Sequence, residues 1–181
     1  MRQLWLLRHA EAEALRAPLT DFERALTARG RAQALAAAER LLQLGLCPDL
    51  LLASPAARAR ETATIVARRL QCLQAIDYQP PLYQASAAAL LAALQRCEAG
   101  VHAVLLVGHN PGLSDLVQQL AQPLAGHREV AAGVTPPGGT AASDDLSSFT
   151  LVTGALCRIA LDIESWAELG STAVTAVALP T

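Results

Sequence analysis

Three short apolar segments of this sequence are each followed at once by polar or charged residues, and two of those polar stretches open helical stretches. The segments span residues 3–7, 49–53 and 101–107. Such compact runs are typical of strands that are covered on both faces, because a strand with one wet face alternates apolar and polar residues. The alternation of strands and helices predicts an α/β fold with a mainly parallel sheet and right-handed crossovers.

Helix start signals separate these strands. Thr27, Ser54, Ser86 and Asn110 are residue types that cap helix N termini, and a proline follows both Ser54 and Asn110. The expected helices run over 28–44, from Ser54-Pro55 to about 70, from Ser86 to about 96, and from Asn110-Pro111 to about 120, with Gly45 ending the first. The apolar face of the first helix is expected to consist of its alanines and of Leu35, Leu41 and Leu42.

The C-terminal third predicts a different kind of structure. Residues 123–147 are rich in Gly, Pro, Ala and Ser, which indicates a flexible loop or insertion. Two further strands are expected at 155–163 and 173–179, joined by a turn that carries Trp166 and paired antiparallel. The whole chain, 1–181, is therefore predicted to form a single domain: a three-layer α/β sandwich with a central, mainly parallel sheet, flanking helices and C-terminal antiparallel strands.

Composition excludes several classes of function. The net charge is −2 and aromatic residues make up 3%, so the clustered basic excess and stacking aromatics of a nucleic-acid-binding protein are lacking. No apolar run approaches the roughly 20 residues of a membrane span, and the first apolar run is too short for a secretory signal. The four cysteines form no Cys-x-x-Cys pair, which favours reduced thiols and a cytoplasmic location.

The residues that follow the three apolar segments carry the chemistry. The first segment ends in Arg8-His9, the second leads to Arg58, and the third ends in His109-Asn110. Ligands of open α/β sheets bind beyond the carboxyl ends of the strands, so these side chains are expected to converge if the strands are parallel neighbours. Two arginines, two histidines and helix N termini suit a dianion such as phosphate. A neutral imidazole there can attack phosphorus if its other ring nitrogen is held as N–H by an acceptor.

The same segments resemble the histidine phosphatase superfamily, once called phosphoglycerate mutase-like, and within it the short, SixA-like phosphohistidine phosphatases. The resemblance covers nearly the whole chain and lies in the runs LLRHAEAE at 6–13, DFERALTARG at 21–30, SPAARARETA at 54–63, LY at 82–83 and VGHNPG at 107–112. Two departures are the alanine at position 10 and the missing proline in Arg24-Ala25-Leu26. The resemblance implies the phosphoglycerate mutase-like form of the three-layer fold.

The resemblance also implies roles for individual residues. His9 would be the phosphorylated nucleophile, Arg8 and Arg58 would bind the phosphoryl group, and His109 would donate to its oxygens. Asn110 is added as a substrate-binding residue on its position beside His109. The family uses no metal and no organic cofactor, and none is expected here. Larger members supply a carboxylic acid as proton donor, for which the candidates in this chain are Glu11, Glu13 and Asp21.

Three functions remain open from the sequence. The first is hydrolysis of phosphohistidine in a phosphorelay or signalling protein, which suits a short chain without an evident acid, because a protonated imidazole leaves without further help. The second is a phosphatase of a small phosphomonoester such as a sugar phosphate. The third is a phosphate-binding module without turnover. The expected partner is accordingly a phosphorylated protein or a small phosphorylated substrate, with no nucleic acid and no membrane.

Overall fold

A six-stranded mixed sheet forms the centre of the molecule in the computed structural model, which describes residues 1–72, 76–121, 149–170 and 174–178. Its strand order is β3-β2-β4-β1-β5-β6. The strands are β1 (Arg2–Arg8), β2 (Leu50–Ala53), β3 (Asp77–Tyr78), β4 (Ala103–Gly108), β5 (Leu156–Leu161) and β6 (Val174–Ala178). The first four are parallel, β5 pairs antiparallel with β1, and β6 pairs antiparallel with β5. The predicted α/β fold is confirmed, including the antiparallel C-terminal pair.

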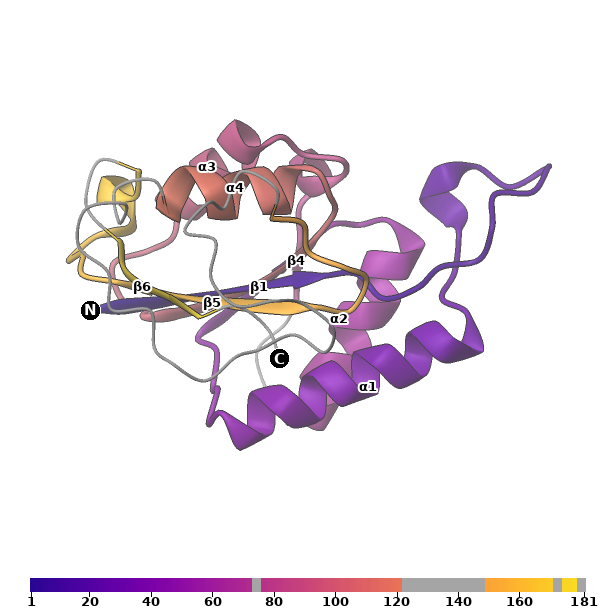
Figure 1. The fold of residues 1–181 in the computed structure, drawn as a ribbon, viewed down its shortest axis with the longest axis horizontal. Coiled ribbons are helices and arrows are strands. Elements are labelled where there is room, and N and C mark those ends of the chain that lie inside the picture. The colour runs from indigo at the N-terminus through magenta and orange to yellow at the C-terminus, as the bar shows by residue number, and fades with distance from the viewer. Residues whose placement is uncertain (73–75, 122–148, 171–173, 179–181) are drawn as a thin grey trace.

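Helices cover both faces of this sheet (Figure 1). The helices are α1 (Ala28–Gln43), α2 (Ala57–Arg69), α3 (Ala87–Gln95) and α4 (Gly112–Ala121). Helices α3 and α4 lie on one face and α1 and α2 on the other. Successive residues of β1 point to opposite faces: Leu4 and Leu6 pack with the α3/α4 side, whereas Trp5 and Leu7 pack with the α1/α2 side. Burial on both faces explains why this strand reads as a continuous apolar run.

The expected helix starts are correct at two positions and wrong at two. Thr27 accepts a hydrogen bond from Gly30 N, and Ser86 accepts one from Ala89 N, so both cap their helices. Ser54 does not cap α2, whose N-cap is Ala56 without a side-chain hydrogen bond. Asn110 does not cap α4 either, because its Oδ1 is buried without a hydrogen-bond partner. Asn110 instead lines the pocket described below, and Ser54 contacts His109, which also lines it.

Leu35 was expected in the core but is 47% exposed. The buried face of α1 consists of Gly30, Ala34, Ala37, Ala38 and Leu41, which lie on one side of the helix because each is three or four residues from another member. Leu35 lies one residue, or about 100° of helix rotation, away from that face. Because alanine side chains are small, α1 can pack closely against α2. Alanines therefore occupy buried positions that side-chain size alone would assign to leucine.

Three short 3₁₀ helices complete the described chain: η1 (Asp21–Glu23), η2 (Pro80–Leu82) and η5 (Trp166–Glu168). Strand β3 and the helices η1 and η2 were not anticipated, because two or three residues carry no periodicity, whereas η5 lies in the turn that was expected at Trp166. The predicted loop at 123–147 lies outside the described residues. Within the described parts of the chain, no helix combines the length and the apolar character needed to cross a membrane.

A glycine fixes the segment that follows β1 against α1. A Cβ added at Gly30 would lie 2.0 Å from the carbonyl oxygen of Glu11, whereas one added at Gly100 would meet nothing within 4 Å. We therefore expect Gly30→Ala to lower the free energy of unfolding by about 2–3 kcal/mol, because the backbone of the segment must shift. Urea unfolding of Gly30→Ala and of the control Gly100→Ala measures this. Equal stability of the two variants would contradict the close packing.

Candidate active site

The carboxyl ends of β2, β4 and β1 lie side by side in the sheet. Arg8, the last residue of β1, pairs with Gly108, the last residue of β4, and Ala53 at the end of β2 pairs with Val107. The ladder continues one residue further, since His9 N donates to Gly108 O at 3.0 Å. The residues that follow all three strands therefore emerge at one edge of the sheet.

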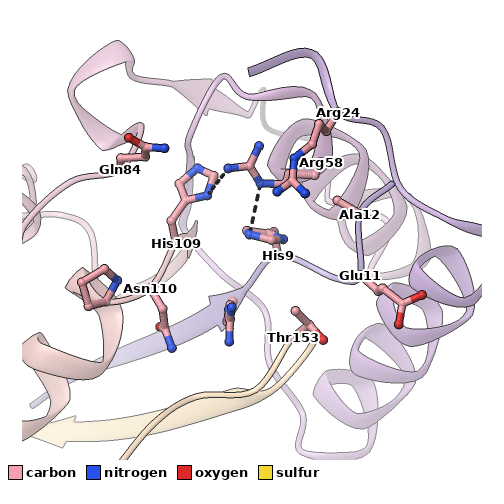
Figure 2. Close-up of a pocket in the computed structure, with 11 residues that line it drawn as sticks. His9, Glu11, Ala12, Arg24, Arg58, Gln84, His109, Asn110 and Thr153 are labelled. Atoms are coloured by element: carbon pink, nitrogen blue, oxygen red, sulfur yellow. Dashed lines mark hydrogen bonds between the residues drawn. The ribbon is translucent and has the colours of Figure 1, made fainter. Parts of the chain in front are cut away.

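A pocket of about 600 Å³ opens at this edge (Figure 2). Six of the predicted residues line it, namely Arg8, His9, Glu11, Arg58, His109 and Asn110. The other lining residues are Ala12, Arg24, Gln84, Pro111 and Thr153. The structure thus brings together predicted side chains from the ends of β1 and β4, from α2 and from the loops beside them, although they are up to 102 positions apart (110 − 8).

His9 has a defined orientation in this pocket. Its Nδ1 lies 2.8 Å from the carbonyl oxygen of Ala10, an acceptor that requires Nδ1–H. The lone pair is then on Nε2, which receives a hydrogen bond from Arg58 Nε at 3.2 Å (Figure 2). The residue is 8% exposed. Held in this way, the imidazole offers one nucleophilic nitrogen to the pocket.

His109 lies opposite, with its ring centroid 5.0 Å from that of His9. Its Nε2 is 2.7 Å from Ser54 Oγ, and its Nδ1 is 3.3 Å from Arg58 Nη2. Because the guanidinium can only donate, Nδ1 is the acceptor and Nε2–H donates to Ser54. Ser54 therefore sets the orientation of His109, a role that the capping prediction obscured.

Arg8 and Asn110 share an anchor on a distant segment. Arg8 Nη1 and Asn110 Nδ2 donate to the carbonyl oxygen of Leu151 at 2.7 and 2.8 Å. Arg8 Nε and Asn110 Oδ1 are buried without hydrogen-bond partners. Within the described ranges no carboxylate pairs with Arg8, whose charge is thus available to an anion in the pocket.

Two further side chains that the sequence prediction did not select support the site. Thr62 Oγ1 accepts a hydrogen bond from Ala10 N at 3.1 Å and donates to Arg58 O at 2.7 Å, so it ties the segment after β1 to α2. Arg24 lines the pocket and lies 3.0 Å from a carboxylate oxygen of Asp21. Thr62 lies four residues after Arg58 on one helix face, a spacing that could have drawn attention to it.

The three candidate acids lie in different surroundings. Glu11 lines the pocket, but its carboxylate accepts a hydrogen bond from Thr27 Oγ1 at 2.9 Å and pairs with Arg29 at 3.4 Å. Glu13 is exposed and does not line the pocket. Asp21 lies just outside the lining and pairs with Arg58 at 3.0 Å. The candidates are therefore not interchangeable, and only Glu11 faces the pocket itself.

Both histidines are neutral at physiological pH. Burial lowers the pKa of His9 to about 4; the charges of Arg58 and Arg8 act in the same direction, and the hydrogen bond to Ala10 opposes them. Burial, followed by His9 and Arg58, lowers the pKa of His109 to about 3. Uncharged imidazoles beside the guanidinium groups leave the arginines as the positive charges of the pocket, which suits a phosphoryl dianion.

The lowered pKa values of His9 and His109 predict how the ligand-free protein titrates. The imidazole resonances of His9 and His109 are expected to remain those of neutral rings from pH 7 down to about 5. Because the unfolded chain takes up these protons near pH 6.5, the free energy of unfolding is greatest above that pH and falls as the pH drops toward 4. Histidine NMR spectra, assigned with a His9→Asn variant, measure the titration. A His9 resonance that titrates near pH 6.5 would contradict the described environment.

The remaining question at the site is whether its side chains could hold a metal ion. Among the described residues, no group of three or more His, Cys, Asp or Glu side chains is placed to hold a metal ion. The four cysteines, which lie at 47, 72, 97 and 157, are free thiols, and Cys157 alone of them is buried.

Comparison with known proteins finds a matching family model and a relative in sequence. A family model described as histidine phosphatase superfamily (branch 1) matches residues 4–83. An uncharacterised protein of Picosynechococcus sp. is 36% identical over 126 residues, which cover 69% of this chain and 76% of that protein.

Two solved structures share the fold over almost the full length of this chain. A protein of Nakamurella multipartitia, assigned as phosphohistidine phosphatase SixA, superposes with a TM-score of 0.72 at 24% identity, covering 99% of this chain and 96% of that one. A protein of Escherichia coli, assigned as an alpha-ribazole-5'-P phosphatase, superposes with a TM-score of 0.68 at 20% identity, covering 100% and 98%. These likenesses concern the fold.

Proposed function

We propose that this chain, which belongs to the histidine phosphatase superfamily and is a histidine-nucleophile phosphatase, hydrolyses phosphohistidine on a phosphorelay or signalling protein. His9 is the nucleophile of this proposal, and Arg8 and Arg58 bind the phosphoryl group. His109, whose Nδ1 is an acceptor in the ligand-free site, also binds the phosphoryl group once that nitrogen takes up a proton as the dianion enters. Asn110 contributes a further polar group at the rim of the same pocket.

The first chemical step transfers the phosphoryl group to His9. Its Nε2 forms the bond to phosphorus while the bond from phosphorus to the substrate's nitrogen breaks, and the departing imidazole carries a proton from solvent. For this attack, Arg58 Nε must give up its hydrogen bond to Nε2 and donate to a phosphoryl oxygen. The exchange keeps the guanidinium hydrogen-bonded throughout and moves its charge onto the oxygens, where negative charge is carried in the transition state.

The second step returns the enzyme to its starting state. Water attacks the phosphorus of phosphorylated His9, the bond between phosphorus and Nε2 breaks, and inorganic phosphate leaves. The hydrogen bond from Nδ1 to Ala10 holds the ring in place through both steps. His9 leaves phosphorus as the neutral imidazole with its Nδ1–H retained, and the protons of the attacking water stay on the released phosphate or pass to solvent.

The proposed substrate class depends on one observation, namely which carboxylates lie beside His9 and which side chains engage them. Of the described residues that line the pocket, Glu11 alone bears a carboxylate, and Thr27 and Arg29 engage it. An alkoxide leaving group depends strongly on a general acid, which contributes typically about 10²–10⁴-fold. An imidazole that is protonated from solvent leaves without one. The site therefore suits cleavage of a P–N bond better than cleavage of an alkyl P–O bond.

Substrate comparison tests this assignment. We expect kcat/KM for a phosphohistidine-containing protein to exceed that for an alkyl phosphate ester by about 10²-fold, because the ester lacks its general acid. Phosphate release from both substrates is measured with the wild-type protein and with His9→Ala, which must lose both activities. Equal or faster turnover of the alkyl ester would overturn the proposed substrate class.

A small phosphomonoester remains the second candidate because Glu11 does line the pocket. If Glu11 leaves Arg29, takes up a proton from solvent and passes it to the ester oxygen as the P–O bond breaks, turnover of the alkyl ester depends on it. Glu11→Gln then lowers ester turnover and leaves turnover of an aryl phosphate, whose leaving group needs no acid, nearly unchanged. Loss on the alkyl ester alone favours this second substrate class.

A further inference from the structure

Asp21 is surrounded by hydrogen-bond donors at the edge of the pocket. Its Oδ2 accepts from Tyr83 OH at 2.8 Å, from Arg58 Nη2 at 3.0 Å and from Gln84 Nε2 at 3.3 Å. Its Oδ1 lies 3.0 Å from Arg24 Nε. Tyr83, Arg58 and Gln84 each donate a hydrogen bond to Oδ2. Arg24 forms an ion pair with Oδ1 but no hydrogen bond, so both carboxylate oxygens are engaged.

The same surroundings decide its protonation state. Desolvation acts to raise the pKa of Asp21, but the hydrogen bond from Tyr83 and the charges of Arg58 and Arg24 outweigh it, and the pKa lies below its usual value. An ionised carboxylate has no proton to give to a leaving group. The contacts of Asp21 therefore indicate a role other than that of the candidate acid.

The partner that matters for catalysis is Arg58. Its Nη1 donates to the backbone oxygen of Asp21 at 2.6 Å and its Nη2 to the Asp21 carboxylate at 3.0 Å. Its Nε and Nη2 are at the same time within 3.2 and 3.3 Å of His9 Nε2 and His109 Nδ1. The guanidinium thus bridges Asp21 and the two imidazoles, and its side chain is only 4% exposed.

We propose that Asp21 is a positioning residue. It accepts from Nη1 and Nη2 of the Arg58 guanidinium, so that Nε and the second N–H of Nη2 face the reacting phosphoryl group. The residue touches neither substrate nor phosphorus in this proposal. It limits the movement that Arg58 makes when it transfers its donors from His9 and His109 to phosphoryl oxygens. Asp21 accepts two hydrogen bonds from the arginine fork, one at its backbone oxygen and one at its carboxylate, and so keeps the donors aligned at little further entropic cost.

Aromatic rings hold the anchor itself in place. Phe22 packs edge-on against Tyr83 at a centroid distance of 5.0 Å, and Tyr83 packs edge-on against His109 at 5.6 Å. Gln84 adopts a φ of 48°, a left-handed conformation that a residue with a side chain adopts at a cost. Tyr83 therefore links the turn that carries Asp21 to the histidine across the pocket.

The test uses leaving groups of different quality. Asp21→Asn keeps the shape of the side chain and removes its charge, and we expect kcat/KM to fall about 10- to 100-fold, as for other residues that orient a catalytic group. The loss should be the same for an aryl phosphate and for an alkyl phosphate, because the residue protonates neither leaving group. The inhibition constant for inorganic phosphate should rise in parallel, since Arg58 also binds the product.

Control variants separate positioning from stability. Glu23→Gln makes the same change of charge on the same turn. The exposed carboxylate of Glu23 accepts hydrogen bonds from Thr20 and does not line the pocket, so the activity of this variant should be unchanged. Tyr83→Phe removes one donor to Asp21 and should give a smaller loss than Asp21→Asn. Asp21→Glu, which restores the charge, should recover part of the activity. Thermal unfolding of each variant identifies any that fails to fold, and for such a variant the Tyr83→Phe result decides.

Three outcomes would overturn the proposal: full activity of Asp21→Asn, a loss confined to the alkyl phosphate, or an equal loss in Glu23→Gln. The second of these would make Asp21 the general acid. The inference does not depend on the physiological substrate. A protein that hydrolyses aryl phosphate but not a phosphohistidine protein refutes the proposed function and leaves the role of Asp21 testable.

Discussion

Replacement of His9 by alanine is expected to lower phosphatase turnover by at least about 10⁴-fold, whatever the phosphorylated substrate, because the atom that forms the bond to phosphorus is removed. The neighbouring groups that bind the phosphoryl oxygens remain. Inorganic phosphate should therefore still bind to the variant. Turnover of an aryl phosphate and isothermal titration with phosphate measure the two effects separately.

The histidine at position 102 provides the control for this experiment. His102 is exposed just before β4, so His102→Ala should behave as the wild-type protein. Rapid quenching followed by mass spectrometry under alkaline conditions should find one added phosphoryl group on His9 of the wild-type protein. Turnover that survives in His9→Ala, or a phosphoryl group on another residue, would refute the assigned nucleophile.

Replacement of Arg58 by alanine has the second largest expected effect. Its guanidinium contacts both histidines and Asp21, so the variant loses the donor that faces the phosphoryl group and leaves the Asp21 carboxylate without its main partner. We expect kcat/KM to fall by about 10²–10³-fold, the range found when one preorganised donor to a developing anion is removed. Both kcat and KM should change, because Arg58 binds the ground state as well.

Lysine at position 58 distinguishes charge from geometry. Arg58→Lys keeps a positive charge, but an ammonium group cannot reach Asp21 and both imidazoles at once as the planar fork does. We therefore expect it to recover only a small part of the lost activity. Arg60, exposed on the same helix, is the matched control, and Arg60→Ala should retain full activity. Full activity of Arg58→Lys would show that positive charge alone is sufficient.

The Arg58 variants also test how the hydrogen bond between Arg58 and His9 affects phosphoryl transfer. In the structure, Arg58 Nε occupies the lone pair of His9 Nε2. The nucleophile is therefore protected until phosphoryl oxygens compete for the guanidinium. A loss in Arg58→Ala means that donation to the phosphoryl oxygens contributes more to turnover than release of His9 Nε2 from this hydrogen bond would gain.

Local sequence signals predicted much of the fold. Thr27 and Ser86 cap their helices, and Gly45, with a φ of 70°, follows the end of α1 as expected. The apolar runs at the starts of the βα units became β1, β2 and β4 with shifts of one or two residues at their ends. These features depend on neighbours within a few positions, so they can be predicted from the sequence alone.

The same local reading failed where a polar side chain had a distant partner. Ser54 looks like a helix cap because a proline follows it, yet its hydroxyl holds His109, which lies 55 positions further along the chain. Asn110 gave the same false signal. A capping residue and a site residue use the same oxygen, and only the packed structure decides which donor reaches it.

The sequence by itself determined which residues stand at the ends of the strands and what chemistry they can perform: His9 and His109 with Arg8 and Arg58. The tertiary structure alone decided that β2, β4 and β1 are neighbours in the sheet, that Arg58 reaches both imidazoles, and that Asp21 holds it. The physical reason is the range of the forces involved. Helix and strand signals act between adjacent residues, whereas the partners of a buried guanidinium are chosen when sheet and helices pack together.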